Sequence, residues 1–127
     1  MSRTTNKTAT TSILAVLFAG IISAPALSQG TTIEFRVVPT DRNPASCQQW
    51  DTALSRVHAF TPTSDGATLR TAGGITTNMT KSAPNVFATT LALGGTNFNV
   101  TADTSRSPKT LEVSEPRIGC RWSAVAP

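Results

Sequence analysis

Hydrophobic and polar positions alternate with a period of two along several short stretches of the chain. In residues 32–38, apolar side chains occupy Ile33, Phe35 and Val37, charged ones lie between them, and Pro39 ends the pattern. Successive side chains of a strand point to opposite faces, so strict alternation predicts a strand with one buried face. We therefore expect an opening strand at residues 32–38.

The clearest pattern consists of two alternating stretches, residues 86–93 and 96–102, on either side of Gly94-Gly95. Two glycines between strands fit a two-residue hairpin loop, whose central positions need positive φ. Such a loop sets Leu93 opposite Thr96, and a slip by one residue would mix the two faces. The predicted register gathers six apolar side chains on one face: Phe87, Leu91, Leu93, Phe98, Val100 and Ala102.

A second glycine pair, Gly73-Gly74, predicts a weaker hairpin between residues 67–72 and 75–80. A two-residue loop there would pair Leu69 with Asn78, a register without a clean apolar face. Toward the end of the chain, two further short strands are expected. The first covers residues 110–115 with Leu111 and Val113 inward, and the second has Ile118, Cys120 and Trp122 on one face.

Two patterns overlap in the segment after residue 45. Apolar residues recur every three or four positions from 47 to 57, which is the helical period, whereas residues 56–61 alternate like a strand. We expect a short helix at residues 46–54 followed by a strand with Val57 and Ala59 inward. Six or seven strands with at most one short helix predict an all-β fold, a small antiparallel β-sandwich.

The first 28 residues differ from the rest and predict a cleavable signal peptide. Arg3 and Lys7 form a basic start, residues 13–22 are apolar apart from Gly20, and small residues follow at 23–28. This three-part order is typical of secretion signals, and the apolar run is too short to span a bilayer.

Small side chains at the expected peptidase positions place cleavage before Gln29, or alternatively before Leu27. One domain, residues 29–127, then remains. We expect a periplasmic or secreted protein that is not inserted in a membrane after cleavage, because no second long apolar run follows.

The two cysteines, Cys47 and Cys120, predict a disulfide bond. An even cysteine count in an exported chain favours a bridge. Zinc ligation lacks partners, because the chain has one histidine and no Cys-x-x-Cys spacing. The composition is rich in threonine and poor in lysine, which favours strands over helices.

The charge balance argues against nucleic acid as a partner. The whole chain carries 11 basic and 7 acidic residues, and loss of Arg3 and Lys7 leaves nine against seven, a net charge of +2 without any basic run. We therefore expect a partner that is another protein or an envelope polymer. The basic residues that we expect to make such contacts are Arg106, Lys109, Arg117 and Arg121.

Catalytic chemistry has little support in the sequence. His58 is the single histidine, no nucleophile motif accompanies it, and alternation with Val57 and Ala59 predicts that it is exposed. We expect no catalytic residues, no metal and no cofactor, and a non-enzymatic interaction module. One alternative is an inhibitor of an envelope or extracellular hydrolase that presents residues 106–109 or Arg117 and Arg121; a small hydrolase using His58 is a second.

Several segments together resemble the transthyretin-like, carboxypeptidase-regulatory type of β-sandwich. They are Val57–Phe60, Asp65-Gly66, Val86-Phe87, Leu93–Gly95, Phe98–Ala102 and Leu111–Val113. The family's Asp-Asn-Gly turn before the phenylalanine strand is replaced here by Ser82–Asn85. The resemblance implies a seven-strand binding or spacer module with no catalytic residues to carry over. An immunoglobulin-like strand order is the alternative.

Overall fold

The computed structural model describes residues 30–127. The predicted signal segment, residues 1–28, and the cleavage positions before Gln29 and Leu27 lie outside the described residues. None of the helices in residues 30–127 is long and apolar enough to cross a membrane.

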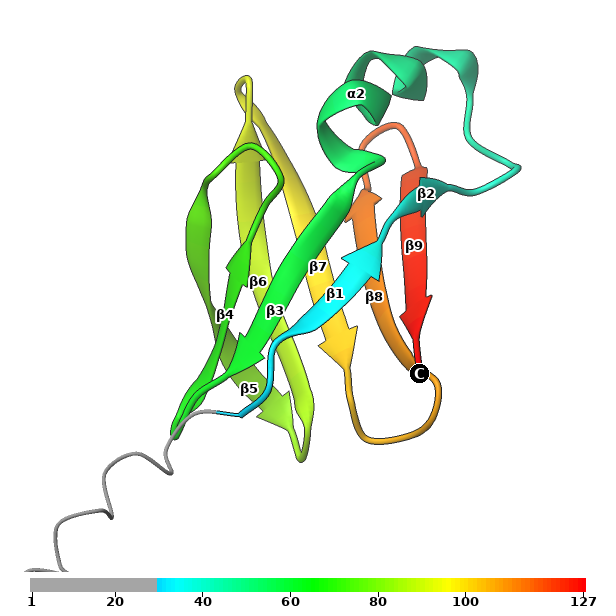
Figure 1. The fold of residues 1–127 in the computed structure, drawn as a ribbon. Coiled ribbons are helices and arrows are strands. Elements are labelled where there is room, and N and C mark those ends of the chain that lie inside the picture. Colours follow the sequence, from blue (N-terminus) through cyan, green and yellow to red (C-terminus); the bar gives the residue numbers. More distant parts are fainter. Residues whose placement is uncertain (1–29) are drawn as a thin grey trace, which may run out of the picture.

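The described chain forms one antiparallel sheet of nine strands (Figure 1). The strands are β1 (Ile33–Arg36), β2 (Val38–Pro39), β3 (Val57–Pro62), β4 (Gly66–Arg70), β5 (Thr76–Ala83), β6 (Val86–Leu93), β7 (Thr96–Asp103), β8 (Lys109–Glu115) and β9 (Cys120–Ala126). Between β2 and β3 lie a 3₁₀ helix, η2 (Ala45–Trp50), and one short α-helix, α2 (Asp51–Leu54). The predicted helix followed by a strand is thus confirmed.

The sheet is a nearly closed barrel, so the predicted sandwich of six or seven strands is wrong. The strand order is β1-β3-β4-β5-β6-β7-β8-β9-β2. The two edge strands, β1 and β2, are consecutive in the chain and meet at Val37. On one side the Val37 N–H donates to Arg56 O at 2.9 Å, and on the other Val38 pairs with Ser123. One continuous stretch therefore joins both edges of a single nine-stranded sheet, whereas a sandwich consists of two sheets.

The turns between strands gather at two ends of the barrel (Figure 1). The helix end holds α2 and the turns β4–β5, β6–β7 and β8–β9. The terminus end holds Gly30, the C-terminus, the turns β3–β4 and β5–β6, and the β7–β8 loop, residues 104–108. These two names are used below.

The hairpin at Gly94-Gly95 is confirmed, including its register. Leu93 pairs with Thr96 and Leu91 with Phe98, and φ is +56° at Gly94 and +83° at Gly95. Positive φ is the conformation that a two-residue hairpin loop requires and that glycine tolerates. Of the six apolar side chains predicted to share a face, five are buried and Leu93 is half-buried.

The register predicted for the other glycine hairpin is wrong by one residue. Leu69 pairs with Thr77, and not with Asn78, because the loop contains three residues and is closed by Thr71 N–H donating to Ile75 O at 2.8 Å. The shift places Met79 opposite Ala67, and both are buried. A clean apolar face results, which the two-residue loop could not produce.

Two aromatic groups fill the barrel. Phe60 packs against Phe35 and Phe87 at ring-centroid distances of 6.3 and 5.3 Å. Phe98 packs against Trp50 and Trp122 at 5.4 and 5.8 Å. Burial of such rings is the largest favourable contribution per residue in a domain of this size.

The predicted disulfide bond between Cys47 and Cys120 is present. Its Cα atoms are 5.7 Å apart, and 73 residues separate the two cysteines. Both are buried, so the bridge fixes η2 to the start of β9. A disulfide-bonded domain fits an oxidising compartment outside the cytoplasm.

Candidate functional site

His58 is buried, and the prediction that it is exposed is wrong. It is only 3% exposed and points to the same face as Phe60, while Val57 and Ala59 are half-buried. Its ring makes two hydrogen bonds, to Leu54 O at 2.9 Å through Nε2 and from the Ala72 N–H at 3.1 Å through Nδ1. Alternation alone did not identify the inward side, because a histidine can occupy a core position when both nitrogens are paired.

The hydrogen bonds of His58 define its tautomer. An amide donates to Nδ1, so Nδ1 carries no proton and Nε2–H must donate to the carbonyl. We expect ¹⁵N NMR to show the ring proton on Nε2. A spectrum with the proton on Nδ1 would contradict this arrangement.

Two carboxylates, the buried Glu115 and the half-buried Asp51, also have structural partners. Glu115, which is buried, accepts the N–H groups of Arg117 and Ile118, each at 2.7 Å. Asp51 accepts the indole N–H of Trp122 at 2.8 Å. These carboxylates close the β8–β9 turn and attach α2 to the core, and no sequence motif marked either role.

Within residues 30–127, no three His, Cys, Asp or Glu side chains gather in a group that could hold a metal ion. His58 has no carboxylate among its hydrogen-bond partners. The arrangement therefore offers neither an oriented general base nor a ligand set in this part of the chain.

The four predicted interaction residues do not form one patch. Arg106 and Lys109 lie at the terminus end, and Arg117 lies in the β8–β9 turn at the helix end. Arg121 is on the outer face of β9, and its Nη1 lies 3.9 Å from Glu112 Oε1. Arg106 and Lys109 therefore lie together in and beside the β7–β8 loop, whereas Arg117 and Arg121 lie toward the other end of the barrel. We take the β7–β8 loop as the candidate site.

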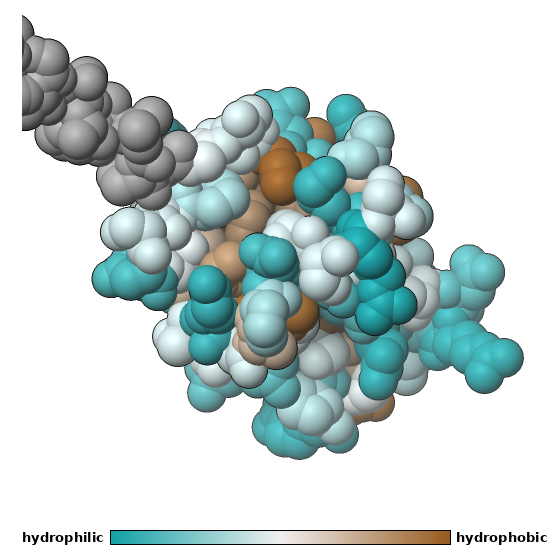
Figure 2. Space-filling model, turned by 90° about the horizontal axis from the view of Figure 1, so that it is seen from below, coloured by the Kyte–Doolittle hydropathy of each residue, from teal (hydrophilic) through white to brown (hydrophobic). Residues whose placement is uncertain are grey.

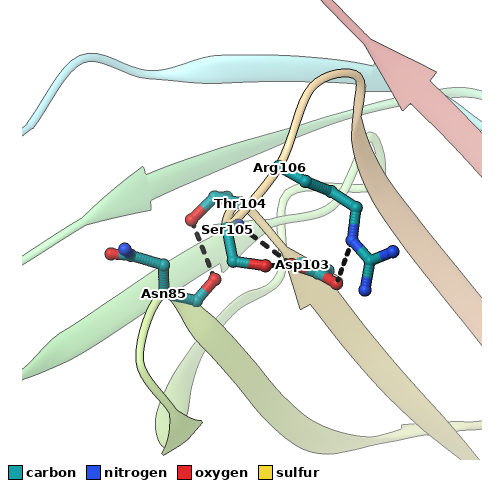
Figure 3. A network of polar contacts seen from close by, with 5 residues as sticks. All are labelled: Asn85, Asp103, Thr104, Ser105 and Arg106. Atoms are coloured by element: carbon teal, nitrogen blue, oxygen red, sulfur yellow. Dashed lines mark hydrogen bonds and ion pairs between the residues drawn. The ribbon is translucent and has the colours of Figure 1, made fainter.

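The β7–β8 loop is held by polar contacts at its start (Figure 3). The Thr104 hydroxyl and N–H both donate to Asn85 O, at 2.9 and 2.8 Å, which ties the loop to the β5–β6 turn. The Ser105 hydroxyl and N–H both donate to Asp103. Asp103 also lies 3.6 Å from Arg106 Nε, while 78% of the Arg106 side chain is exposed. The loop therefore presents a basic side chain from a braced backbone.

These contacts act on the ionisation of Asp103. The hydroxyl bond from Ser105, then its N–H, and then the Arg106 charge lower the pKa of Asp103, while burial opposes them. Because the folded pKa lies below the unfolded one, the stabilisation is present at neutral pH and is lost as pH falls through the folded pKa.

We expect Ser105→Ala to raise the pKa of Asp103 toward its ordinary value, because the largest cause of the shift is removed. An NMR titration of the Asp103 carboxyl carbon measures this change, with Ser107→Ala as the control. An unchanged titration in Ser105→Ala would show that the hydroxyl does not hold the carboxylate.

Figure 2 shows the terminus end from below. Polar side chains dominate the face in view, and hydrophobic ones appear as small separate areas between them. Contact at this end would therefore be polar, since small scattered apolar areas are ordinary on a protein surface.

No known family, curated protein or solved structure matches this chain.

Proposed function

We propose that this is an exported, non-enzymatic protein that binds another macromolecule in the periplasm or outside the cell. The observation that carries the proposal is the braced β7–β8 loop, which holds Arg106 in solvent. Loops on a rigid scaffold are the usual place for recognition, and a pre-organised loop loses little conformational entropy on binding.

The surroundings of the loop indicate the chemistry of the partner. Arg106 is the exposed cation, while Lys109 Nζ donates to Pro127 O at 2.9 Å. An exposed guanidinium favours carboxylate or phosphate groups, which it can bind with two parallel hydrogen bonds. The partner is thus an acidic surface on a protein or an envelope polymer.

Affinity capture from an envelope extract tests the proposal with mature, disulfide-bonded protein as bait. We expect a stoichiometric partner that is retained by the wild-type protein and by Arg70→Glu, an exposed position on β4, and lost with Arg106→Glu. A partner retained by Arg106→Glu would contradict the role of the loop. Turnover of a small substrate that disappears in folded His58→Gln would contradict the absence of enzymatic function.

A braced loop with an exposed arginine also suits the narrower function of a hydrolase inhibitor. A rigid loop can occupy a hydrolase's binding cleft and resist turnover, because its backbone does not relax after contact. Loss of hydrolase activity in the same extract on addition of the wild-type protein, with no loss on addition of Arg106→Glu, would distinguish an inhibitor from a simple binding protein.

A further inference from the structure

A small hollow lies at the helix end, away from the β7–β8 loop. It has a volume of about 110 Å³, and its walls come from α2, the start of β3, the β4–β5 turn and the end of β6. The apolar lining residues are Ala53, Leu54, Ile75, Leu91 and Leu93.

Two polar side chains on the wall of this hollow, those of His58 and Thr71, already have partners inside the protein. Both nitrogens of His58 are hydrogen-bonded, and Thr71 Oγ1 accepts the Ile75 N–H at 3.1 Å. A ligand would therefore meet an apolar surface there. Ile75 is 46% exposed at this position, although a large aliphatic side chain is normally buried.

Arg56 supplies a positive charge at the same place. It lines the hollow and is exposed. It takes part in neither of the two ion pairs found in residues 30–127. A cation next to an apolar hollow is complementary to a ligand with an aliphatic chain and a negatively charged end.

The size of the hollow limits the length of the aliphatic chain that a ligand can place in it. A cavity of about 150 Å³ can hold benzene, so this smaller one accepts roughly four or five carbon atoms. We propose that the hollow between α2, the β4–β5 turn and β6 binds a short aliphatic carboxylic acid, with the chain against Leu91 and Leu93 and the carboxylate at Arg56.

The ligand is a free acid and not the end of a polypeptide. Recognition of a peptide needs main-chain hydrogen bonds as well as a side-chain pocket. In the β4–β5 turn four of these groups are occupied, because Thr71 N–H donates to Ile75 O, Ala72 N–H to His58, Gly74 N–H to Thr71 O and Ile75 N–H to Thr71 Oγ1. The aliphatic chain and the charge of the ligand therefore carry most of its recognition.

Methyl NMR titration of the mature protein with pentanoate tests the site. We expect saturable shifts at the methyl groups of Ile75, Leu91 and Leu93, with a millimolar Kd. Affinity should increase from acetate to pentanoate and then level off at octanoate, because the longer chain exceeds the hollow. Pentylammonium should bind more weakly than pentanoate, since it carries the opposite charge.

Arg56→Gln should weaken pentanoate binding roughly three- to fivefold, and Arg106→Gln, at the opposite end of the barrel, should leave it unchanged. Equal binding of pentylammonium, shifts confined to other methyl groups, the absence of saturation, or no effect of Arg56→Gln would each overturn the proposal. Tighter binding of N-acetyl-leucine than of 4-methylpentanoate would show that the ligand is a polypeptide terminus. These results are independent of the β7–β8 loop.

Discussion

Replacing Phe98 by alanine should lower the free energy of unfolding by about 3–5 kcal/mol. Phe98 is fully buried on β7 and contacts both indole rings, those of Trp50 and Trp122. Removal of the ring eliminates these contacts and leaves a cavity that the surrounding barrel can only partly fill. Urea unfolding followed by circular dichroism measures the difference.

Asn99 provides the matched control for this substitution. It is the next residue on β7, and its side chain is exposed on the outer face of the barrel. Asn99→Ala should change the free energy of unfolding by less than about 0.5 kcal/mol. Equal losses for Phe98→Ala and Asn99→Ala would show that the register of β6 and β7 is wrong.

Loss of the disulfide bond should lower the free energy of unfolding by about 2–5 kcal/mol. The bridge closes a loop of 73 residues, so in the chain-entropy model it restricts the unfolded chain by roughly 4 kcal/mol. The bridge also fixes η2 in place. The helix α2 follows η2 directly, and it contributes the Leu54 carbonyl that binds His58 and the Asp51 carboxylate that binds Trp122.

Denaturant unfolding of oxidised wild-type protein, reduced wild-type protein and Cys47→Ser/Cys120→Ser measures this contribution. Reduction should lower stability to the level of the double variant and should have no effect on that variant. Two reactive thiols in freshly purified, denatured wild-type protein would show that the bond is absent in solution.

Most of the strands, the hairpin at Gly94-Gly95 and the disulfide bond could be predicted from sequence because each follows from local or countable features. The period of two identified the faces of β1, β7 and β8. Gly94-Gly95 fixed a register by turn chemistry alone. The cysteine pair needed only an even count and an export signal.

The closure of the sheet could not be predicted in the same way. Alternation tells which side of a strand is buried, and the inner face of a barrel and the inner face of a sandwich give the same pattern. What separates them is the pairing of Val38 with Ser123, a contact between distant residues that no local pattern encodes.

The site was predictable only in part. The exposed loop around Arg106 followed from its composition, but its attachment to Asn85 depends on two turns being adjacent in space. His58 was assigned to the wrong face because its two neighbours on β3 are more apolar than it is. Its two hydrogen bonds offset the cost of burying the imidazole. They depend on Leu54 and Ala72, so the pattern of apolar and polar positions along the sequence does not predict them.

The order of the strands has a consequence for how the chain folds. From β3 to β9 every strand pairs with the next one in sequence, so each hairpin can form by closing a short loop at small entropic cost. The pairing of β2 with β9 joins residues far apart in the sequence, and such long-range pairings form slowly because the entropy of loop closure must be overcome first. The barrel should therefore form as a meander that closes last at Val38 and Ser123. The Cys47–Cys120 bond lies close to the β2–β9 pairing. Once formed, it would reduce the conformational entropy that the chain loses when these two strands pair.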